Sequence, residues 1–139
     1  MKEESYGVIP LEKNEEGWKV LIVQLHAGHW TYPKGRKNQD EPNLHAAERE
    51  LLEETGLKVD QFLTLRPYLE NYIFQRKGET IDKYAWYYPA LVSGTLTLQE
   101  EEIKAAQWVS PKEALETLTY LPTKNITFQL IKDLELIIS

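Results

Sequence analysis

The chain contains two kinds of hydrophobic pattern, one typical of strands and one typical of helices. Five segments are rich in β-branched, aromatic and aliphatic residues and are separated by polar turns. They predict strands at residues 6–11, 18–26, 62–74, 80–92 and 107–109. The polar residues 76–79, between the third and fourth of these segments, predict the turn of a long hairpin.

Three further segments carry apolar residues at helical spacing. Residues 43–55 predict a helix that ends at Gly56, because a left-handed residue often follows the last helical turn. Ser110 and Glu113 have the spacing of a capping box and predict a second, short helix. A third helix follows Pro122, with apolar residues at Ile126, Leu130, Ile131, Leu134 and Ile138. The order of these elements indicates an α+β fold, with a mixed β-sheet between helices.

Length and composition narrow the classes of protein to consider. The chain has 139 residues, 42% of them hydrophobic and 27% charged, which predicts a single globular domain over residues 1–139. We find no membrane-length apolar run and no signal peptide, so we expect a cytoplasmic protein without a membrane partner. The absence of cysteine excludes disulfides, thiolate zinc sites and a cysteine nucleophile.

The net charge and one long loop point to a small ligand. A formal charge of −6 argues against binding of long nucleic acid through its phosphates. A small anion remains an option if local cations or a metal ion reverse the field. Residues 27–42 have no apolar periodicity, and a loop of this length in a small domain is usually functional or disordered.

The predicted helix at residues 43–55 carries the first candidate chemistry. At about 100° per residue, Glu50, Glu53 and Glu54 lie on one face. Like charges at these spacings destabilise a helix, and the single guanidinium of Arg49 cannot neutralise three acids. Carboxylates of this kind suit Mg²⁺, which keeps part of its water shell for a phosphate. The alternative is a solvated acidic face, which is the common role of Glu-rich helices.

The residues around these carboxylates form a longer sequence motif, which is far more specific than the spacing of the three glutamates. Its defined positions are Gly35, Glu41, Arg49, Glu50, Leu51, Glu53, Glu54, Gly56 and Leu57. Chance agreement with such a frame is on the order of 10⁻¹⁰ per starting point. This segment resembles the Nudix box, and the resemblance implies an α/β/α sandwich that hydrolyses nucleoside diphosphates linked to another group. It also implies Mg²⁺ or Mn²⁺ as the cofactor.

The resemblance assigns roles within the box. Gly35, Glu50, Glu53 and Glu54 are the implied metal ligands, together with Glu102 outside the box, while Glu41 and Arg49 are expected to hold the loop and the helix in place. The catalytic residues are expected among Glu53, Glu54 and Glu102, and the sequence leaves the general base open. Many family members carry Pro-Gly before the first box glutamate, whereas this chain has Gln39-Asp40.

The loop before the box indicates a subfamily. Residues 29–35 are similar to the His-Trp-x-x-Pro-Lys-Gly segment of asymmetrical diadenosine tetraphosphate hydrolases. Lys34 is expected to neutralise phosphate oxygens, with a solvated loop lysine as the alternative. His29 could donate to a phosphate or complete a strand-end hydrogen bond.

Two tyrosines are candidates for stacking on a base. Tyr87 best matches a substrate-side tyrosine of that subfamily, and Tyr120 matches a second ring more loosely. Aromatic rings recognise bases by stacking, but strand aromatics more often pack in the core. Glu102 stands six residues before Trp108, as the extra family glutamate does; the alternative for it is a solvated acidic loop.

The expected function is therefore metal-dependent cleavage of dinucleoside polyphosphates, with diadenosine tetraphosphate giving ATP and AMP. The partner is a small nucleotide, and a monomer or weak dimer is expected. Two alternatives stay open. One is a nucleoside triphosphate or RNA 5′-end pyrophosphohydrolase, and the other is a nucleotide-binding sensor without catalytic activity.

Overall fold

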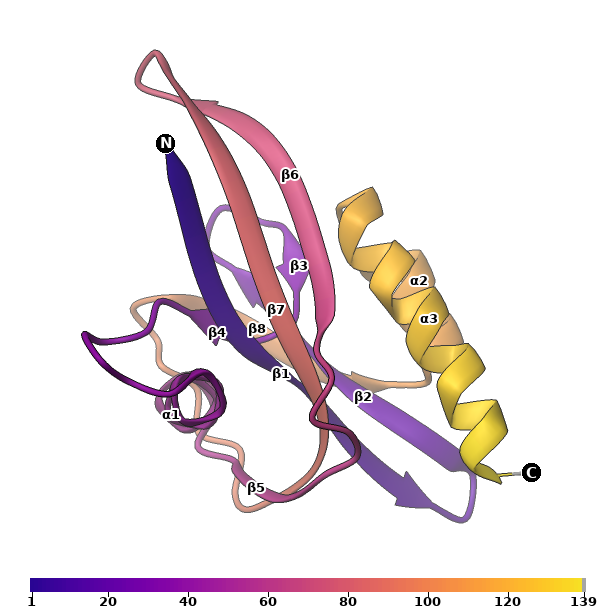
Figure 1. Cartoon of the computed structure of the whole chain (residues 1–139). Helices are drawn as coiled ribbons and strands as arrows, with labels where there is room; N and C mark the ends of the chain where they lie inside the picture. The colour runs from indigo at the N-terminus through magenta and orange to yellow at the C-terminus, as the bar shows by residue number, and fades with distance from the viewer. Residues whose placement is uncertain (139) are drawn as a thin grey trace.

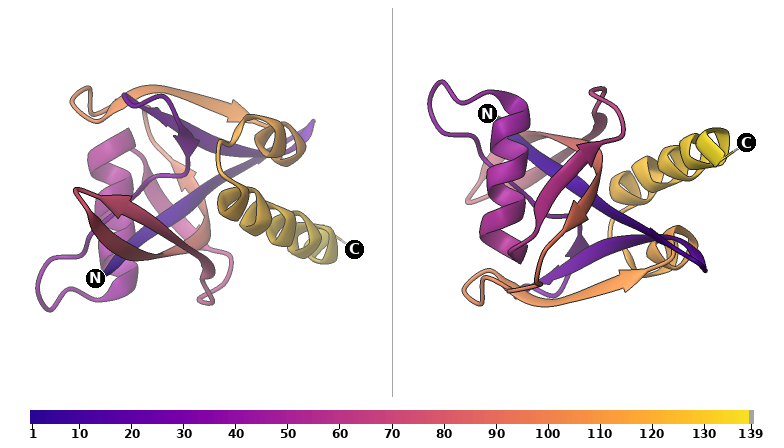
Figure 2. Two further views of the ribbon diagram at one scale, coloured as in Figure 1. Left: turned by 90° about the horizontal axis from the view of Figure 1, so that it is seen from above. Right: turned by 90° about the horizontal axis from the view of Figure 1, so that it is seen from below.

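A mixed β-sheet lies between helices on its two faces (Figure 1). The computed structural model describes the backbone of residues 1–138 and the side chains of residues 1–135. Helix α1 (Asn43–Thr55) covers one face, and helices α2 (Pro111–Thr117) and α3 (Leu121–Ile138) cover the other, as the two end-on views show (Figure 2). The predicted α+β sandwich is confirmed, although the side chain of Ile138 lies outside the described residues.

The centre of the sheet is a parallel pair of long strands. Strand β1 (Lys2–Asn14) runs parallel to β7 (Glu79–Ser93), from Lys2 opposite Asp82 to Leu11 opposite Leu91. All the other pairings are antiparallel, which makes the sheet mixed. The remaining strands are β2 (Gly17–Leu25), β3 (Trp30–Thr31), β4 (Lys34–Gly35), β5 (Lys58–Phe62), β6 (Tyr68–Arg76) and β8 (Ile103–Val109).

Alternation along these strands divides the core into two clusters. In β1, Ile9 and Leu11 pack with residues of α2 and α3, whereas Tyr6 and Val8 pack with residues of α1. Successive strand residues point to opposite faces, so one strand contributes to both clusters. Burial on both faces explains why the centre of β1 reads as a continuous apolar run rather than an alternating one.

The structure differs from the sequence prediction in three places. The predicted strand over residues 62–74 is two strands, β5 and β6, because the connection between them contains Pro67, which lacks an N–H for a ladder. The loop over residues 27–42 contains the short strands β3 and β4. Strand β8 begins at Ile103 and not at Gln107, since residues 103–106 pair with the end of β2.

The predicted helix and hairpin ends are confirmed. Ser110 and Glu113 form both hydrogen bonds of a capping box at the start of α2. Gly56 ends α1 with φ of 77°. The β6–β7 turn has positive φ at Lys77 and Gly78, as a two-residue hairpin turn requires. Asp40 also has positive φ, at 64°, in the place where many family members have glycine. A short polar side chain tolerates this conformation.

Candidate active site

Helix α1 carries a buried pair of carboxylates on the side facing the sheet. Glu54 is only 3% exposed, and one of its oxygens, Oε2, has no hydrogen-bond partner. Glu50 lies one helical turn earlier, with a side chain 14% exposed. Residues four apart in a helix are neighbours on its surface, so the two carboxylates lie side by side. A buried carboxylate with a free oxygen is costly unless a cation or a proton compensates it.

The pKa of Glu54 reflects this crowding. Burial is the largest cause, followed by the negative charges of Glu50 and Glu102, and together they raise the pKa of Glu54 to about 9. Burial also raises the pKa of Glu50. Without a cation, one of these groups therefore holds a proton at neutral pH. Glu102, an exposed residue just before β8, lies near the end of α1, because its N–H donates to the carbonyl of Gln99, whose own N–H donates to the carbonyl of Glu54.

The glycine at position 35 makes room for Glu50. A Cβ atom at Gly35 would lie 2.0 Å from Cδ of Glu50, so the carboxylate of Glu50 would have to leave its position. Strand β4 holds Gly35 in this place by pairing it with Tyr6 of β1. Only glycine allows the backbone to come so close to a functional side chain.

An arginine network fixes the loop and the outer side of α1. Arg49 donates to both oxygens of Glu41, at 2.8 and 3.0 Å, and to the backbone carbonyl of Arg36. It also donates to Glu50 and Glu53. The hydrogen bonds from Arg49 lower the pKa of Glu41 to about 2. These contacts are those of the strut expected from the sequence.

The α1 carboxylates fit a divalent cation in part. The free oxygen of Glu54, the adjacent Glu50 and the space that Gly35 leaves provide hard oxygen donors in a buried place. Within the described residues, however, no three carboxylate or imidazole side chains converge closely enough to enclose a metal ion. Glu53 binds Arg49 and its side chain is 49% exposed. The inner set is therefore Glu50 and Glu54, while Glu53 and Glu102 lie around it.

Lys34 faces away from α1, on the side of the sheet that α3 covers. Its Nζ lies 3.5 Å from Oε1 of Glu70 and 5.8 Å from the ring centroid of Tyr72. Burial disfavours its charged form, but Tyr87 and Glu70 outweigh this effect, so the pKa of Lys34 is raised. Lys34 is thus a largely buried ammonium, not a solvated loop lysine.

An aromatic pocket of about 450 Å³ lies on the same side of the sheet. Two of the predicted substrate residues meet there, since the ring centroids of His29 and Tyr120 are 5.4 Å apart. Burial and the charge of Lys34 lower the pKa of His29. We call this feature the aromatic pocket; its lining is His29, Tyr72, Ile73, Phe74, Tyr120 and Pro122.

The prediction that Tyr87 stacks on a base is wrong for this structure. Tyr87 is 0% exposed and packs edge-on against Tyr32 within the α3-side core. A ring with no exposed face cannot receive a base, so packing is the role of Tyr87. The exposed ring on this side is Tyr120, at 53%.

The sequence analysis missed three residues of this region. Glu70, Tyr72 and Phe74 alternate along β6, so their side chains point to one face of the sheet. Alternation within residues 62–74 could have grouped them. It could not have shown which face stays open, because that depends on the position of α3.

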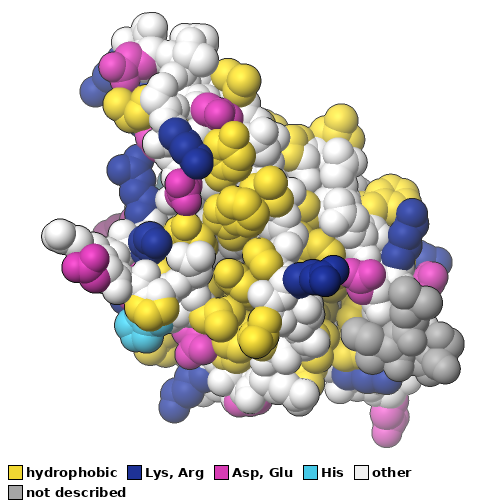
Figure 3. Space-filling view, viewed as in Figure 1, with side chains coloured by type: hydrophobic (Ala, Val, Ile, Leu, Met, Phe, Trp, Pro, Cys, Tyr) yellow, Lys and Arg dark blue, Asp and Glu magenta, His cyan; other side chains and the backbone are white. Residues whose placement is uncertain are grey.

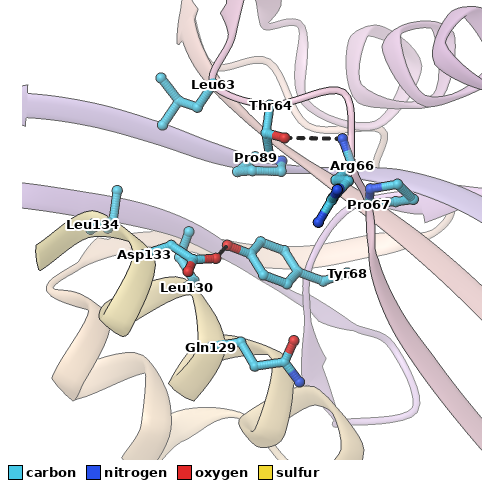
Figure 4. Close-up of a pocket in the computed structure, with 10 residues that line it drawn as sticks. All are labelled: Leu63, Thr64, Arg66, Pro67, Tyr68, Pro89, Gln129, Leu130, Asp133 and Leu134. Carbon is cyan, nitrogen blue, oxygen red and sulfur yellow. Dashed lines mark hydrogen bonds between the residues drawn. The ribbon is translucent and has the colours of Figure 1, made fainter. Parts of the chain in front are cut away.

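A second cavity, of about 440 Å³, lies between α3 and the connection before β6 (Figure 4). Its lining includes Tyr68, whose hydroxyl donates to Asp133, but none of the predicted site residues. Elsewhere, no helix within the described part of the chain has the length and apolar character that crossing a membrane requires.

Comparison with known proteins identifies the family. The NUDIX domain model matches residues 1–130. The chain is 33% identical over 107 residues to the CTP pyrophosphohydrolase of Escherichia coli, covering 73% of this chain and 74% of that protein. It is 28% identical over 110 residues to the asymmetrical bis(5′-nucleosyl)-tetraphosphatase of Mus musculus, covering 76% and 74%.

The fold also matches a solved structure. A C. elegans Ap4A hydrolase in a binary complex superposes with a TM-score of 0.74 at 20% identity, over 95% of this chain and 97% of that one. This likeness concerns the fold, whereas the family model covers nearly the whole sequence, including the carboxylates of α1. The chain therefore belongs to the Nudix family.

Proposed function

We propose that the protein hydrolyses dinucleoside polyphosphates, and that it cleaves diadenosine tetraphosphate into ATP and AMP. The observation that carries the proposal is the position of Lys34. Its ammonium lies beside the aromatic pocket, 5.8 Å from the ring centroid of Tyr72, and its charge also acts on Glu54 of α1. Lys34 borders the aromatic pocket on one face of the sheet, and the next residue, Gly35, lies against Glu50 on the other face, so a phosphate chain bound at β4 would lie near both.

The protein groups divide the work of such a reaction. Tyr120 and His29 would hold a base at the open end of the aromatic pocket, since stacking is worth about 1–3 kcal/mol per base. Lys34 would neutralise non-bridging phosphate oxygens. Glu50 and Glu54 would hold Mg²⁺ or Mn²⁺, with Glu53, Glu102 and the backbone of Gly35 as further donors. Such an ion supplies a more acidic water and stabilises phosphate charge.

The proton of the attacking water needs an acceptor near α1. Glu102 is exposed and its charge acts on Glu54, so it can approach a water at the carboxylate pair. Glu53 is the alternative, although its carboxylate is bound by Arg49. Among the described residues, Glu102 forms no ion pair that it would have to break before it accepts a proton. We therefore prefer Glu102 as the general base.

A substrate panel tests this proposal. Diadenosine tetraphosphate, ATP, CTP and a 5′-triphosphorylated RNA are incubated with protein and Mg²⁺, and products are separated by ion-exchange chromatography. ATP plus AMP from the first substrate is the expected result. Two molecules of ADP would show symmetrical cleavage and contradict the proposal, and tight binding without turnover of any substrate would indicate a sensor.

The α1 carboxylates provide a sharper test in the same assay. Glu54→Gln should lower kcat by about 10²–10⁴-fold, because a neutral amide is a poor partner for a divalent cation. Its thermal stability without metal should not fall, since a Glu54 carboxyl with a pKa of about 9 is neutral at pH 7 and the amide has nearly the same size. Glu48→Gln, an exposed position on the same helix, is the control. Full activity of Glu54→Gln, or of the parent in excess chelator, would refute the metal assignment.

One observation favours a second candidate, a nucleoside triphosphate pyrophosphohydrolase. The relative from Escherichia coli, at 33% identity, is a CTP pyrophosphohydrolase. The same carboxylates and Lys34 would serve this reaction, and only the group beyond the phosphates differs. Turnover of CTP a hundredfold faster than that of diadenosine tetraphosphate would select this candidate.

A further inference from the structure

A strongly cationic groove lies at the start of β1, in a chain whose net charge is −6. It encloses about 510 Å³ and is lined by five cationic groups and only two carboxylates. Several Lys and Arg side chains are visible at this end of the molecule, near the N-terminus and the β6–β7 turn (Figure 3). We call this feature the cationic groove; its lining is Met1, Lys2, Glu3, Glu4, Tyr6, Arg36, Lys37 and Arg76.

A single carboxylate organises the inner part of the groove. Glu3 is 8% exposed and accepts from Arg36 at 2.9 Å and from Arg76. The ammonium of Lys83 lies 3.7 Å from its other oxygen. One carboxylate thus faces three cations. It fixes their positions, but it cannot neutralise them.

The excess positive charge affects the neighbouring lysine. Burial and the charge of Lys34 lower the pKa of Lys83 to about 8, although Glu3 acts in the opposite direction. Arg36 contributes a further repulsion. Lys83 is thus the third cationic group beside the single carboxylate of Glu3, and an anion in the groove would compensate the remaining positive charge.

The cationic groove lies near the candidate active site, although it shares no lining residue with the aromatic pocket. Arg36 directly follows Gly35, which contacts Glu50 of α1. On the other side, Tyr72, Phe74 and Arg76 alternate along one face of β6, and the Tyr72 and Phe74 ring centroids are 5.9 Å apart. Tyr72 is the ring beside Lys34. At about 3.3 Å per residue, Arg76 lies roughly 13 Å along the strand from Tyr72. Lys34 and Arg76 thus lie at the two ends of this face of β6, and Arg36 follows Lys34 by two residues.

We propose that the cationic groove binds the phosphate chain of the substrate beyond Lys34, so that the protein prefers nucleotides with long phosphate chains. This inference rests on the proposed function and extends it to residues outside the Nudix box. A triphosphate held at Lys34 has few phosphate groups left to reach Arg36 and Arg76, whereas a longer chain has more. The groove therefore supplies selectivity by chain length, which neither α1 nor the aromatic pocket provides.

Binding of inorganic tripolyphosphate tests the groove without any turnover. The full chain is titrated calorimetrically at low salt with chelator present. The test variant is Arg36→Gln/Lys37→Ser, in which Glu3 keeps Arg76 and Lys83 as partners and does not become an unpaired buried charge. The control is Lys58→Ser/Lys112→Ser, which removes a similar charge from exposed positions elsewhere.

The test variant should bind tripolyphosphate at least tenfold more weakly than the parent, and the control should bind within twofold. Its KM for diadenosine tetraphosphate should rise more than its KM for ATP, with kcat nearly unchanged. Equal affinity in the test variant and the control would overturn the groove assignment. If the parent does not hydrolyse diadenosine tetraphosphate but the test variant loses tripolyphosphate binding, the proposed function fails and the groove stands.

Discussion

Lys83 is the residue in which burial and charge conflict most clearly. It donates to Ser5 at 2.6 Å and faces Glu3 from β1, while Lys34 and Arg36 repel it. Its pKa is about 8 in the folded chain, against a usual value of 10.5. The unfolded chain therefore binds more protons between these two pH values, and the free energy of unfolding contributed by this residue rises with pH through that window.

This linkage predicts a difference between two urea titrations. From pH 8 to pH 10, the parent should gain free energy of unfolding relative to Lys83→Met, which has no ammonium to titrate. The comparison cancels the titration of the other groups. Parallel curves for the two proteins would show that Lys83 keeps its ordinary pKa when folded.

Glu102 gives a second prediction at the residue scale. Glu102→Gln should lower kcat for the preferred substrate at least tenfold at neutral pH, because general-base catalysis is typically worth 10²–10⁴-fold. Glu101→Gln, the exposed neighbour, should be nearly silent. Parent-like pH–rate profiles for both variants would transfer the base role to Glu53.

Single residues also show which features of the site can be predicted from the sequence and which cannot. The position of Glu50 and Glu54 on one face of α1 could be predicted from helical spacing and the Nudix box, because the local geometry of a helix determines it. Tyr87 and Tyr88 point to opposite faces of β7, and both are buried because helices cover both faces at that point. Tyr72 stays half-exposed because α3 leaves the aromatic pocket open over that part of the face of β6. Which faces are covered is a tertiary property that no local pattern contains.

At the scale of elements, the end of α1 depends on Gly56 for two reasons. Its φ is 77°, and a Cβ atom there would lie 2.9 Å from the carbonyl oxygen of Thr95, in the segment that returns past the helix. Thr97 N–H donates to the carbonyl of Thr55, which holds this segment in place. The helix end therefore also positions the chain that leads to Glu102.

Two glycine substitutions measure the cost of the backbone conformation and the cost of the close contact separately. Gly78→Ala, at φ of 81° with open space around it, should cost about 1–2 kcal/mol of stability from the backbone conformation alone. Gly56→Ala should cost about 1–3 kcal/mol more, because of the contact with Thr95. Urea denaturation measures both, and equal losses would mean that the segment moves aside freely.

The helix ends and the hairpin turn could be predicted from the sequence more accurately than the boundaries of the strands. Capping and turn residues such as Ser110, Gly56 and Gly78 act locally, so their sequence signatures suffice. The first half of β8 contains a lysine and two alanines, which are poor strand formers, and its pairing with β2 makes it a strand. The short strands β3 and β4 likewise exist because β2 and β1 lie beside them.

At the scale of the whole molecule, the two core clusters share their strands. Ile9 and Val8 are neighbours in β1 but belong to different clusters, one under α3 and one under α1. Neither cluster can lose its packing without disturbing the strand that both use. We therefore expect one cooperative unfolding transition for the chain, as small single domains usually show.

Two probes check this expectation. Tryptophan fluorescence reports mainly on local packing around the four tryptophans, whereas far-ultraviolet circular dichroism reports on the helices and the sheet. The two urea transitions should coincide in midpoint and slope. Separate midpoints would mean that the α1 side and the α3 side unfold independently.

The parallel pairing of β1 with β7 has a consequence for synthesis on the ribosome. Lys2 lies opposite Asp82, so the first strand leaves the ribosome about 80 residues before its partner. At roughly 5–20 residues per second, this wait lasts about 4–16 s. During that time β1 can pair with β2 through Leu11–Asn14 and with the two-residue strand β4 through Tyr6 and Gly7, so most of its apolar centre has no partner. The nascent chain thus depends on this first hairpin, or on a chaperone, to keep its central strand from aggregating before the sheet can close.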